Sequence, residues 1–110
     1  MKIFHLAIAD TWHAAQQSGT YTVSTLGLDL TDVGFIHCSQ AEQLDGVHER
    51  FYREVSDPVL LLLTIDTDLL TSPWQLDSVV GEPLPFPHIY GPLNVEAVVT
   101  AEPFRRSTSS

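Results

Sequence analysis

The sequence predicts a small α+β domain, with one strongly bent sheet or two small sheets and two helices packed on the outside. Two strand-like segments are each followed by a helical segment, and the second half of the chain is mostly strand-like. This order of elements is typical of α+β proteins. The 110 residues are enough for one domain. We therefore expect a single globular domain over residues 1–104.

Residues 2–8 are predicted as the first strand. Alternate residues of a strand face opposite sides of its sheet. The side that carries Phe4, Leu6 and Ile8 is the expected core face. His5 then points from the other face, among small neighbours.

The first helix is predicted to follow this strand directly. Asp10 is a suitable N-cap for a helix that continues to about Ser18. Gly19 suits the first position past the helix end, where a left-handed conformation is common. Trp12 and Ala15 form the expected buried stripe.

Residues 35–39 are predicted as the second strand. His37 and Cys38 are adjacent and must therefore face opposite sides of the sheet. They cannot form a Cys-His nucleophile pair with each other. Ile36 shares a face with Cys38, and Phe35 shares the other face with His37.

The second helix is predicted over about residues 40–53. Ser39 and Glu42 have the spacing of a capping box, which predicts Ser39 as the N-cap. Leu44, Val47 and Phe51 follow helical spacing and should pack on the core. The free N–H groups of such a helix start, close to a histidine and a hydroxyl, indicate a place for a polar or anionic ligand.

The other segments give weaker patterns. Residues 20–33 allow a strand or a covering loop, and we expect a lid over a pocket. The near-continuous apolar run Val59–Ile65 predicts a central strand buried on both faces. The rest is predicted, in chain order, as a break at Asp57-Pro58, a helical turn at 66–70, a strand at 74–79, a loop at 80–87, a rigid aromatic turn at 86–92, a closing strand at 94–101 and a disordered tail at 105–110.

The composition limits the classes of partner. The chain has 5 Lys and Arg against 14 Asp and Glu, with a net charge of −9. This acidic balance argues against nucleic acid as a partner, because phosphate backbones are bound by cations. The single cysteine excludes an internal disulfide, and no signal peptide or membrane span is recognisable. We expect a cytoplasmic protein without membrane association, and the sequence does not predict an oligomeric state.

Three histidines in separate segments are the main candidates for chemistry. Histidine titrates near neutral pH, so His5, His37 and His88 could share one cleft, or each could be buried and hydrogen-bonded to nearby backbone. A zinc site from these three matches no local signature, and we predict no metal. The candidate site residues are His37 and His88 as catalytic groups, and His5, Ser39, Tyr52, Tyr90 and Asp77 as ligand-binding groups.

Several motifs together resemble a bacterial family catalogued as domain of unknown function 952. They are Ile3–Ala7, Gly34–Ser39, Phe51-Tyr52 and Phe86–Leu93, and the resemblance extends over about residues 2–104. The family is distantly similar to the ADP-ribosyltransferase-like fold, whose enzymes bind NAD in a cleft between two small sheets.

This resemblance implies roles for particular residues. His5 would contact the nicotinamide ribose, and Tyr90 or Tyr52 would stack on the nicotinamide. Family members commonly carry a glutamate after the aromatic residue that corresponds to Trp74. Here Gln75 stands at that position, with Asp77 two residues later, so either Asp77 supplies the carboxylate or the chain lacks it.

The sequence thus predicts a histidine-lined cleft for a nucleotide-like or other small polar ligand, with NAD as a candidate cofactor and a transferase as a candidate activity. The alternative is a non-enzymatic binding or regulatory module whose histidines are structural. A hydrolase with an unrelated substrate is a third possibility.

Overall fold

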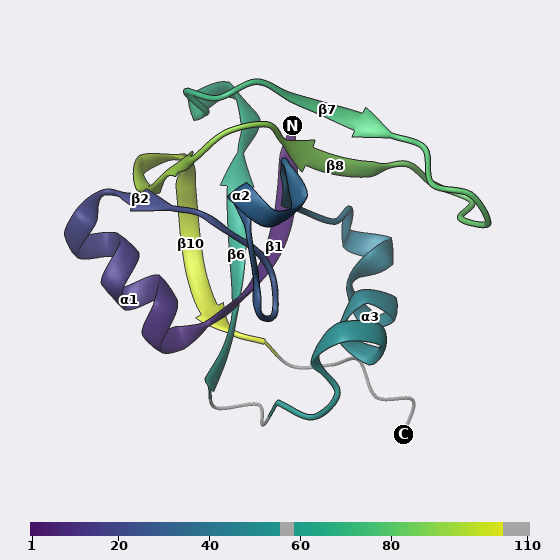
Figure 1. Cartoon of the computed structure of the whole chain (residues 1–110), viewed down its shortest axis with the longest axis horizontal. Helices are drawn as coiled ribbons and strands as arrows, with labels where there is room; N and C mark the ends of the chain where they lie inside the picture. The colour runs from purple at the N-terminus through teal and green to yellow at the C-terminus, as the bar shows by residue number, and fades with distance from the viewer. Residues whose placement is uncertain (56–58, 105–110) are drawn as a thin grey trace.

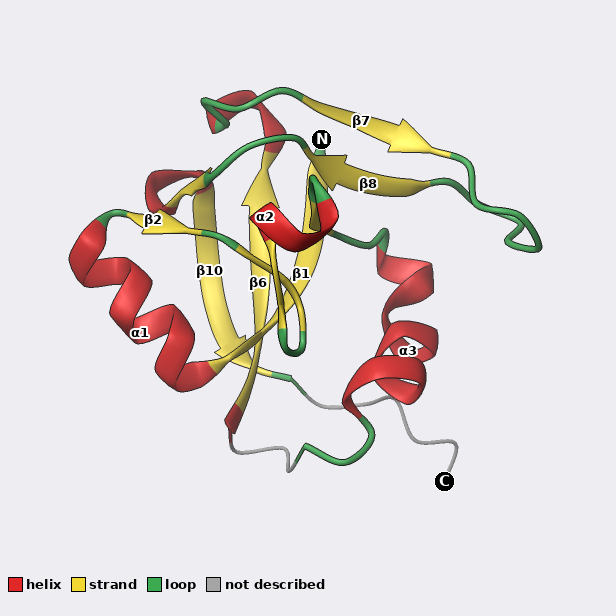
Figure 2. Ribbon diagram, in the orientation of Figure 1, coloured by secondary structure: helices red, strands yellow, loops and turns green. Residues whose placement is uncertain are grey.

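The computed structural model describes residues 1–55 and 59–104, so the predicted break at Asp57-Pro58 and the predicted tail at 105–110 lie outside the described residues. The strands form two three-stranded sheets and two two-stranded pairs, and the helices are few and mostly short (Figure 2). This confirms the α+β class. None of the helices in the described part of the chain has the length and apolar character that a bilayer crossing requires.

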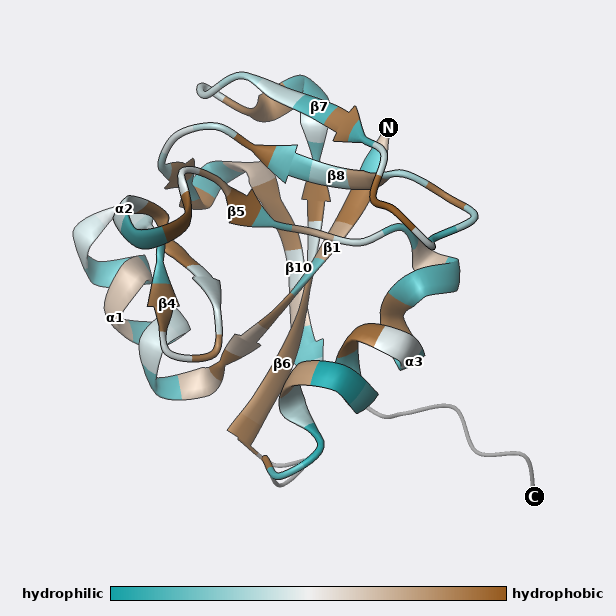
Figure 3. Cartoon of the chain, turned by 45° about the vertical axis from the view of Figure 1, so that its right-hand side comes forward, coloured by the Kyte–Doolittle hydropathy of each residue, from teal (hydrophilic) through white to brown (hydrophobic). Residues whose placement is uncertain are grey.

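The first sheet has the strand order β1-β6-β10, with antiparallel neighbours. It consists of β1 (Lys2–Ile8), β6 (Leu60–Asp66) and β10 (Val98–Pro103). β6 runs between the other two strands (Figure 1), and its brown colour in Figure 3 marks it as apolar. Leu63 belongs to one hydrophobic cluster and Leu60 to a second. The prediction of a central strand covered on both faces is therefore confirmed.

The predicted core face of β1 is confirmed only at Leu6, which is 3% exposed, and the opposite face is buried as well. Ile3, His5 and Ala7 are almost completely buried, whereas Phe4 and Ile8 are only half-buried. Both faces of this sheet are covered by other elements, so the hydrophobicity of alternate residues does not separate an inner face from an outer one.

His5 is accommodated in the core because both its ring nitrogens have partners. Its Nδ1 lies 2.7 Å from the backbone carbonyl of His37, and its Nε2 lies 2.8 Å from the hydroxyl of Tyr21. A carbonyl only accepts, so Nδ1 carries the proton and Nε2 accepts from the phenol. Burial lowers the pKa of His5 to about 4, against a smaller opposing effect of the carbonyl. The imidazole is therefore neutral at pH 7.

The second sheet has the order β5-β8-β7, with β5 (Ile36–His37), β8 (Phe86–Ile89) and β7 (Trp74–Asp77). β7 and β8 lie across the end of the first sheet that carries the N-terminus (Figure 1). The prediction of a turn throughout 86–92 is wrong, because Phe86–Ile89 is the central strand. Pro87 has no N–H to donate, but its carbonyl accepts from the backbone N–H of Cys38 at 2.9 Å.

A pair of backbone hydrogen bonds connects the two sheets. The N–H of Phe4 donates to the carbonyl of Ser39 at 2.9 Å, and the N–H of Ser39 donates back at 2.7 Å. This bridge holds the chain directly after β5 against the middle of β1, and it buries Ser39.

The first helix agrees with its prediction except at its start. α1 (Ala9–Ser18) buries Trp12 and Ala15 and ends at Gly19, whose φ of +88° is left-handed. The N-cap is Ile8 without a side-chain hydrogen bond, and not Asp10. The strand passes directly into the helix here, which leaves no separate capping turn.

The second helical segment is continuous but irregular. It consists of a 3-10 turn (Ala41–Gln43), α3 (Leu44–Val47) and a π turn (His48–Tyr52). The N-cap is Gln40, which forms a reciprocal capping box with Gln43. The predicted cap at Ser39 is wrong, because the bridge to β1 holds that residue in extended structure. The π turn leaves Phe51 41% exposed instead of in the core.

The remaining elements are short. They are β2 (Thr20–Tyr21), β3 (Val23–Thr25), β4 (Leu28–Asp29), α2 (Leu30–Val33), a 3-10 turn at Thr67–Leu69, β9 (Leu93–Asn94) and a 3-10 turn at Val95–Ala97. The helical turn within 66–70 is confirmed. The closing strand was predicted too early: the chain first pairs β9 with β2, turns, and then joins β6 as β10.

The completely buried Leu63 provides a test of the core. Leu63→Ala should lower the free energy of unfolding by about 2–5 kcal/mol, because it removes a side chain from a packed interior and leaves a cavity. Leu69→Ala, at a position 48% exposed, is the matched control and should change stability little. Urea unfolding followed by circular dichroism measures both.

The buried His5 predicts acid sensitivity. Its pKa in the folded protein is below its ordinary value, so stability is complete above about pH 6.5 and is lost as the pH falls towards 4. Between pH 7 and pH 5 this group alone should lower the free energy of unfolding by about 2 kcal/mol. His5→Asn should reduce the slope of the profile over this range and leave the part that His37 contributes, while His13→Asn, on the exposed side of α1, should leave the slope unchanged. An equal slope in His5→Asn and the unaltered protein would contradict the assignment.

Candidate functional site

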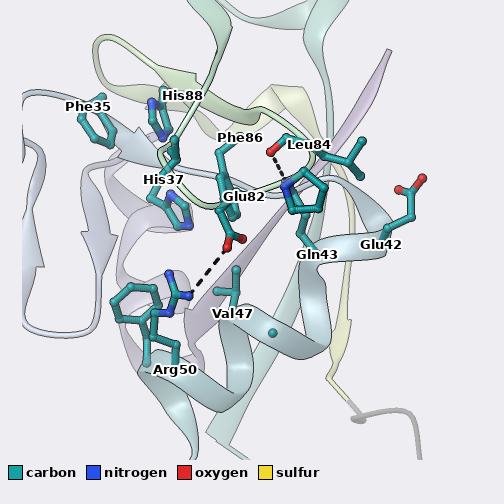
Figure 4. A pocket seen from close by; sticks show the side chains of 14 residues that line it. Phe35, His37, Glu42, Gln43, Val47, Arg50, Glu82, Leu84, Phe86 and His88 are labelled. Carbon is teal, nitrogen blue, oxygen red and sulfur yellow. Dashed lines mark hydrogen bonds and ion pairs between the residues drawn. The ribbon is translucent and has the colours of Figure 1, made fainter.

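A pocket of about 480 Å³ lies between the second sheet, the helical segment around α3 and the loop that joins β7 to β8 (Figure 4). Its walls come from three separate parts of the chain. The lining residues are Phe35 directly before β5, His37, Phe86 and His88 from the sheet, Glu42, Gln43, Gly46, Val47, Arg50 and Phe51 from the helical segment, and Val79, Glu82, Pro83 and Leu84 from the loop.

Successive side chains at and around β5 point alternately into the core and into the pocket, as predicted. Ile36 and Cys38 are completely buried in the core, whereas Phe35 and His37 line the pocket. Burial raises the pKa of the Cys38 thiol far above its usual range. The thiol is therefore unavailable as a nucleophile, although it stands next to a pocket histidine in the sequence.

His37 forms part of the apolar wall but has a polar atom with no partner. Its ring centroid lies 5.0 Å from that of Phe86 and 6.1 Å from that of Phe51. Its Nε2 is buried and makes no hydrogen bond. Burial first, and then the nearby His5, His88 and Arg50, lower the pKa of His37 to about 4. The ring is therefore neutral at pH 7.

His88 lies opposite His37 on the neighbouring strand, with the ring centroids 5.6 Å apart. Its Nδ1 lies 2.7 Å from a carboxylate oxygen of Asp77 on β7. The same oxygen accepts from the hydroxyl of Tyr90, and the other accepts from Nε2 of Gln75 at 2.6 Å. These donors, the Tyr90 hydroxyl first, lower the pKa of Asp77, despite an opposing effect of burial.

Two glutamines hold the loop over the helical segment. The side-chain amide of Gln40 donates to the carbonyl of Pro85 at 2.9 Å. That of Gln43 donates to the carbonyls of Leu84 and Pro85, each at 3.1 Å. An ion pair of 3.9 Å between Arg50 and Glu82 joins the same two walls (Figure 4).

The structure brings together only some of the predicted site residues. His37 and His88 line the pocket, and Asp77 and Tyr90 lie directly behind His88. His5 stands beneath the backbone of His37 and does not line the pocket.

Two further candidates, Ser39 and Tyr52, lie elsewhere. Ser39 is 2% exposed. Tyr52 is buried in the second hydrophobic cluster and lines a smaller cavity of about 310 Å³ beside Tyr21. The stretch 20–33 borders this smaller cavity, so within the described residues it does not cover the histidine pocket.

Sequence reasoning missed the polar residues of the helical wall and of the loop. Gln43 and Arg50 are two helical turns apart, on the same side as Val47. That spacing would have placed them on one face, but the loop that contributes Glu82 carries no pattern that points back to it. No group of three or more His, Cys, Asp or Glu side chains in residues 1–55 and 59–104 is arranged to hold a metal ion.

Comparisons with known proteins agree with this fold. No curated protein matches the chain. The crystal structure of protein CC0527 from Caulobacter crescentus matches with a TM-score of 0.80 and 28% identity, covering 96% of this chain and 87% of that one. A crystal structure of its double mutant gives the same values. The solution NMR structure of CC0527 matches with a TM-score of 0.73 and 26% identity, covering 93% and 83% of the two chains.

The family model described as "Protein of unknown function (DUF952)" matches residues 6–101. This range contains β5, β8 and the helical segment, which carry most of the pocket wall. The chain therefore belongs to the DUF952 family.

Proposed function

We propose that this protein binds a small, flat, uncharged molecule with hydrogen-bonding groups, of the nucleobase or nucleoside kind, in the histidine pocket. The observation that carries the proposal is the buried Nε2 of His37, which faces no protein partner. A buried polar group without a hydrogen bond costs about 1–3 kcal/mol. A ligand that supplies the missing partner recovers that free energy.

The shape and lining of the pocket support a flat ligand. Its volume of about 480 Å³ falls within the range of about 300–1,000 Å³ that is typical of small-molecule sites. Phe35, Phe51 and Phe86 line it together with the two imidazoles. Aromatic walls of this kind favour the stacking of planar rings.

The charges in the pocket disfavour a phosphate. Among the lining residues that the described part of the chain contributes, Arg50 is the one cation, and it already pairs with Glu82. Glu42 adds a second carboxylate. His37 is neutral at pH 7, so it adds no compensating charge. The helix start offers no anion site either, because its first regular turn, α3, has only four residues.

As a second candidate we propose an ADP-ribosyltransferase-like protein that takes NAD. The observation that favours it is the position of Asp77, which supports His88 beside the pocket and could supply the carboxylate expected two residues earlier. The burial of His5, whose ring nitrogens are both hydrogen-bonded, argues against the ribose contact that the resemblance implies. A binding module without activity would use the same pocket.

The experiment that tests both candidates is a binding panel. Thermal shift and calorimetry would compare free bases, nucleosides, mononucleotides and NAD with the unaltered protein. We expect nucleosides to stabilise it more than the matching mononucleotides, because the added phosphate meets two carboxylates. Tighter binding of mononucleotides would contradict the proposal, and tight binding of NAD alone would favour the second candidate.

His37→Phe separates binding from stability. The substitution keeps a ring of similar size between Phe51 and Phe86 and removes the unpartnered nitrogen. The free energy of unfolding should stay level or rise by about 1 kcal/mol, while ligand affinity should fall at least about tenfold, the equivalent of one lost hydrogen bond. Chemical denaturation and calorimetry measure the two effects. His13→Phe on α1 is the control. Equal affinity of the ligand for His37→Phe and for the unaltered protein would contradict a hydrogen bond between His37 and the ligand.

A further inference from the structure

We propose that Asp77 and His88 form an acid–base pair, in which Nε2 of His88 takes a proton from a hydroxyl group of a bound ligand or of water. The inference rests on the proposed function for the place where the substrate is held. It adds a chemical activity to the binding of a ligand in this pocket.

The contact with Asp77 determines the tautomer of His88. Nδ1 lies 2.7 Å from Oδ2 of Asp77, and an ionised carboxylate only accepts hydrogen bonds. Nδ1 therefore carries the proton in the neutral ring, and Nε2 keeps its lone pair. Because His88 lines the pocket, Nε2 is the ring nitrogen left to meet a ligand.

The carboxylate of Asp77 is held rigidly. Asp77 accepts from His88, from the hydroxyl of Tyr90 and from the side-chain amide of Gln75. Three donors from two strands and the turn after β8 fix its orientation. They also favour its ionised form, in agreement with its lowered pKa. Asp77 is thus a positioning residue that stabilises the imidazolium formed when His88 accepts a proton.

The plane of the His88 imidazole is fixed as well. The ring of Phe35 stacks on His88 with centroids 3.9 Å apart and an angle of 19° between the planes. The His88 side chain is only 7% exposed. On the pocket side the neighbouring group is His37, which is neutral at pH 7. The carboxylate on one edge and the stacked ring on one face hold the imidazole in one plane, which fixes the direction of the Nε2 lone pair.

The lining residues also limit the chemistry. Among those contributed by the described part of the chain, none is Ser, Thr, Tyr or Cys. A hydroxyl that gives its proton to His88 must therefore come from water or from the ligand itself. Asp77 and His88 resemble two members of a catalytic triad without its protein nucleophile.

An activated ester serves as a probe of this base. With 4-nitrophenyl acetate, the O–H bond of water breaks and its proton passes to Nε2, while the oxygen attacks the acyl carbon. The bond from that carbon to the 4-nitrophenolate then breaks, and Nε2 returns the proton to the medium. The products are acetate, 4-nitrophenolate and two protons, so the step is balanced without an oxidant or a further reactant.

The first measurement is the imidazole nitrogen NMR spectrum of the full chain at neutral pH. We expect His88 to show a protonated Nδ1 and an unprotonated Nε2. Asp77→Ala should change the signals of His88 towards a mixture of tautomers, while Tyr90→Phe, which keeps the carboxylate, should preserve them. A proton on Nε2 of His88 in the unaltered protein overturns the proposal, and this result needs no variant to fold.

The second measurement is the release of 4-nitrophenolate. We expect kcat to fall at least about tenfold in His88→Gln and in Asp77→Asn, the lower end of what a lost general base costs, with KM nearly unchanged in Asp77→Asn. His13→Gln, on the exposed surface of α1, is the control and should match the unaltered protein. Equal rates in the unaltered protein and in His88→Gln overturn the proposal.

The two proposals fail in different ways. If nucleosides bind but His88→Gln and the unaltered protein release 4-nitrophenolate equally fast, the pocket binds without acting as a base. If ester cleavage depends on Asp77 and His88 while no nucleoside, base or nucleotide binds, the base is present and the proposed ligand class is wrong.

Discussion

The buried hydrogen bonds of His5 are the interaction on which the rest of the structure depends. One neutral imidazole joins the middle of β1 to the backbone of β5 and to the phenol of Tyr21. Leaving a buried donor or acceptor unpaired costs about 1–3 kcal/mol, so the three segments are held in one relative position. The carbonyl that accepts the bond belongs to His37, which lines the pocket. The same contact therefore holds this part of the pocket wall in place.

The pocket combines a strongly satisfied network with one unsatisfied atom. Asp77 and the two glutamines use their hydrogen-bonding groups within the protein, on the sheet and on the loop respectively. His37, between them, keeps a buried nitrogen without a partner. Natural proteins seldom leave such a group without a reason, and functional sites are where they accept the loss of stability. Because this nitrogen lies in the wall of a cavity, a ligand there can supply the missing partner.

The sequence predicted the parts of the fold that are governed by local patterns. Alternation placed His37 and Cys38 on opposite faces, and Gly19 and the apolar run before Asp66 located a helix end and a central strand. It failed where tertiary contacts override local preference. The bridge to β1 removed Ser39 from the cap, and pairing with two neighbours made Phe86–Ile89 a strand. Residues on both faces of β1 are buried, so the strand has no single core side. For the site, sequence supplied two of the histidines and Asp77, but no local pattern could show that a loop forty residues away closes over Gln43.

The position of Cys38 has a consequence for how this cavity behaves in different surroundings. The sulfur sits on the reverse of the strand that presents His37, with no exposed surface and with its thiol kept protonated by burial. Thiolate character and exposure are what oxidants and alkylating reagents require. Because alternate residues of the strand face opposite sides, Cys38 faces the core while His37 faces the pocket. We therefore expect oxidising conditions to leave this thiol, and the pocket on the other side of the strand, unmodified.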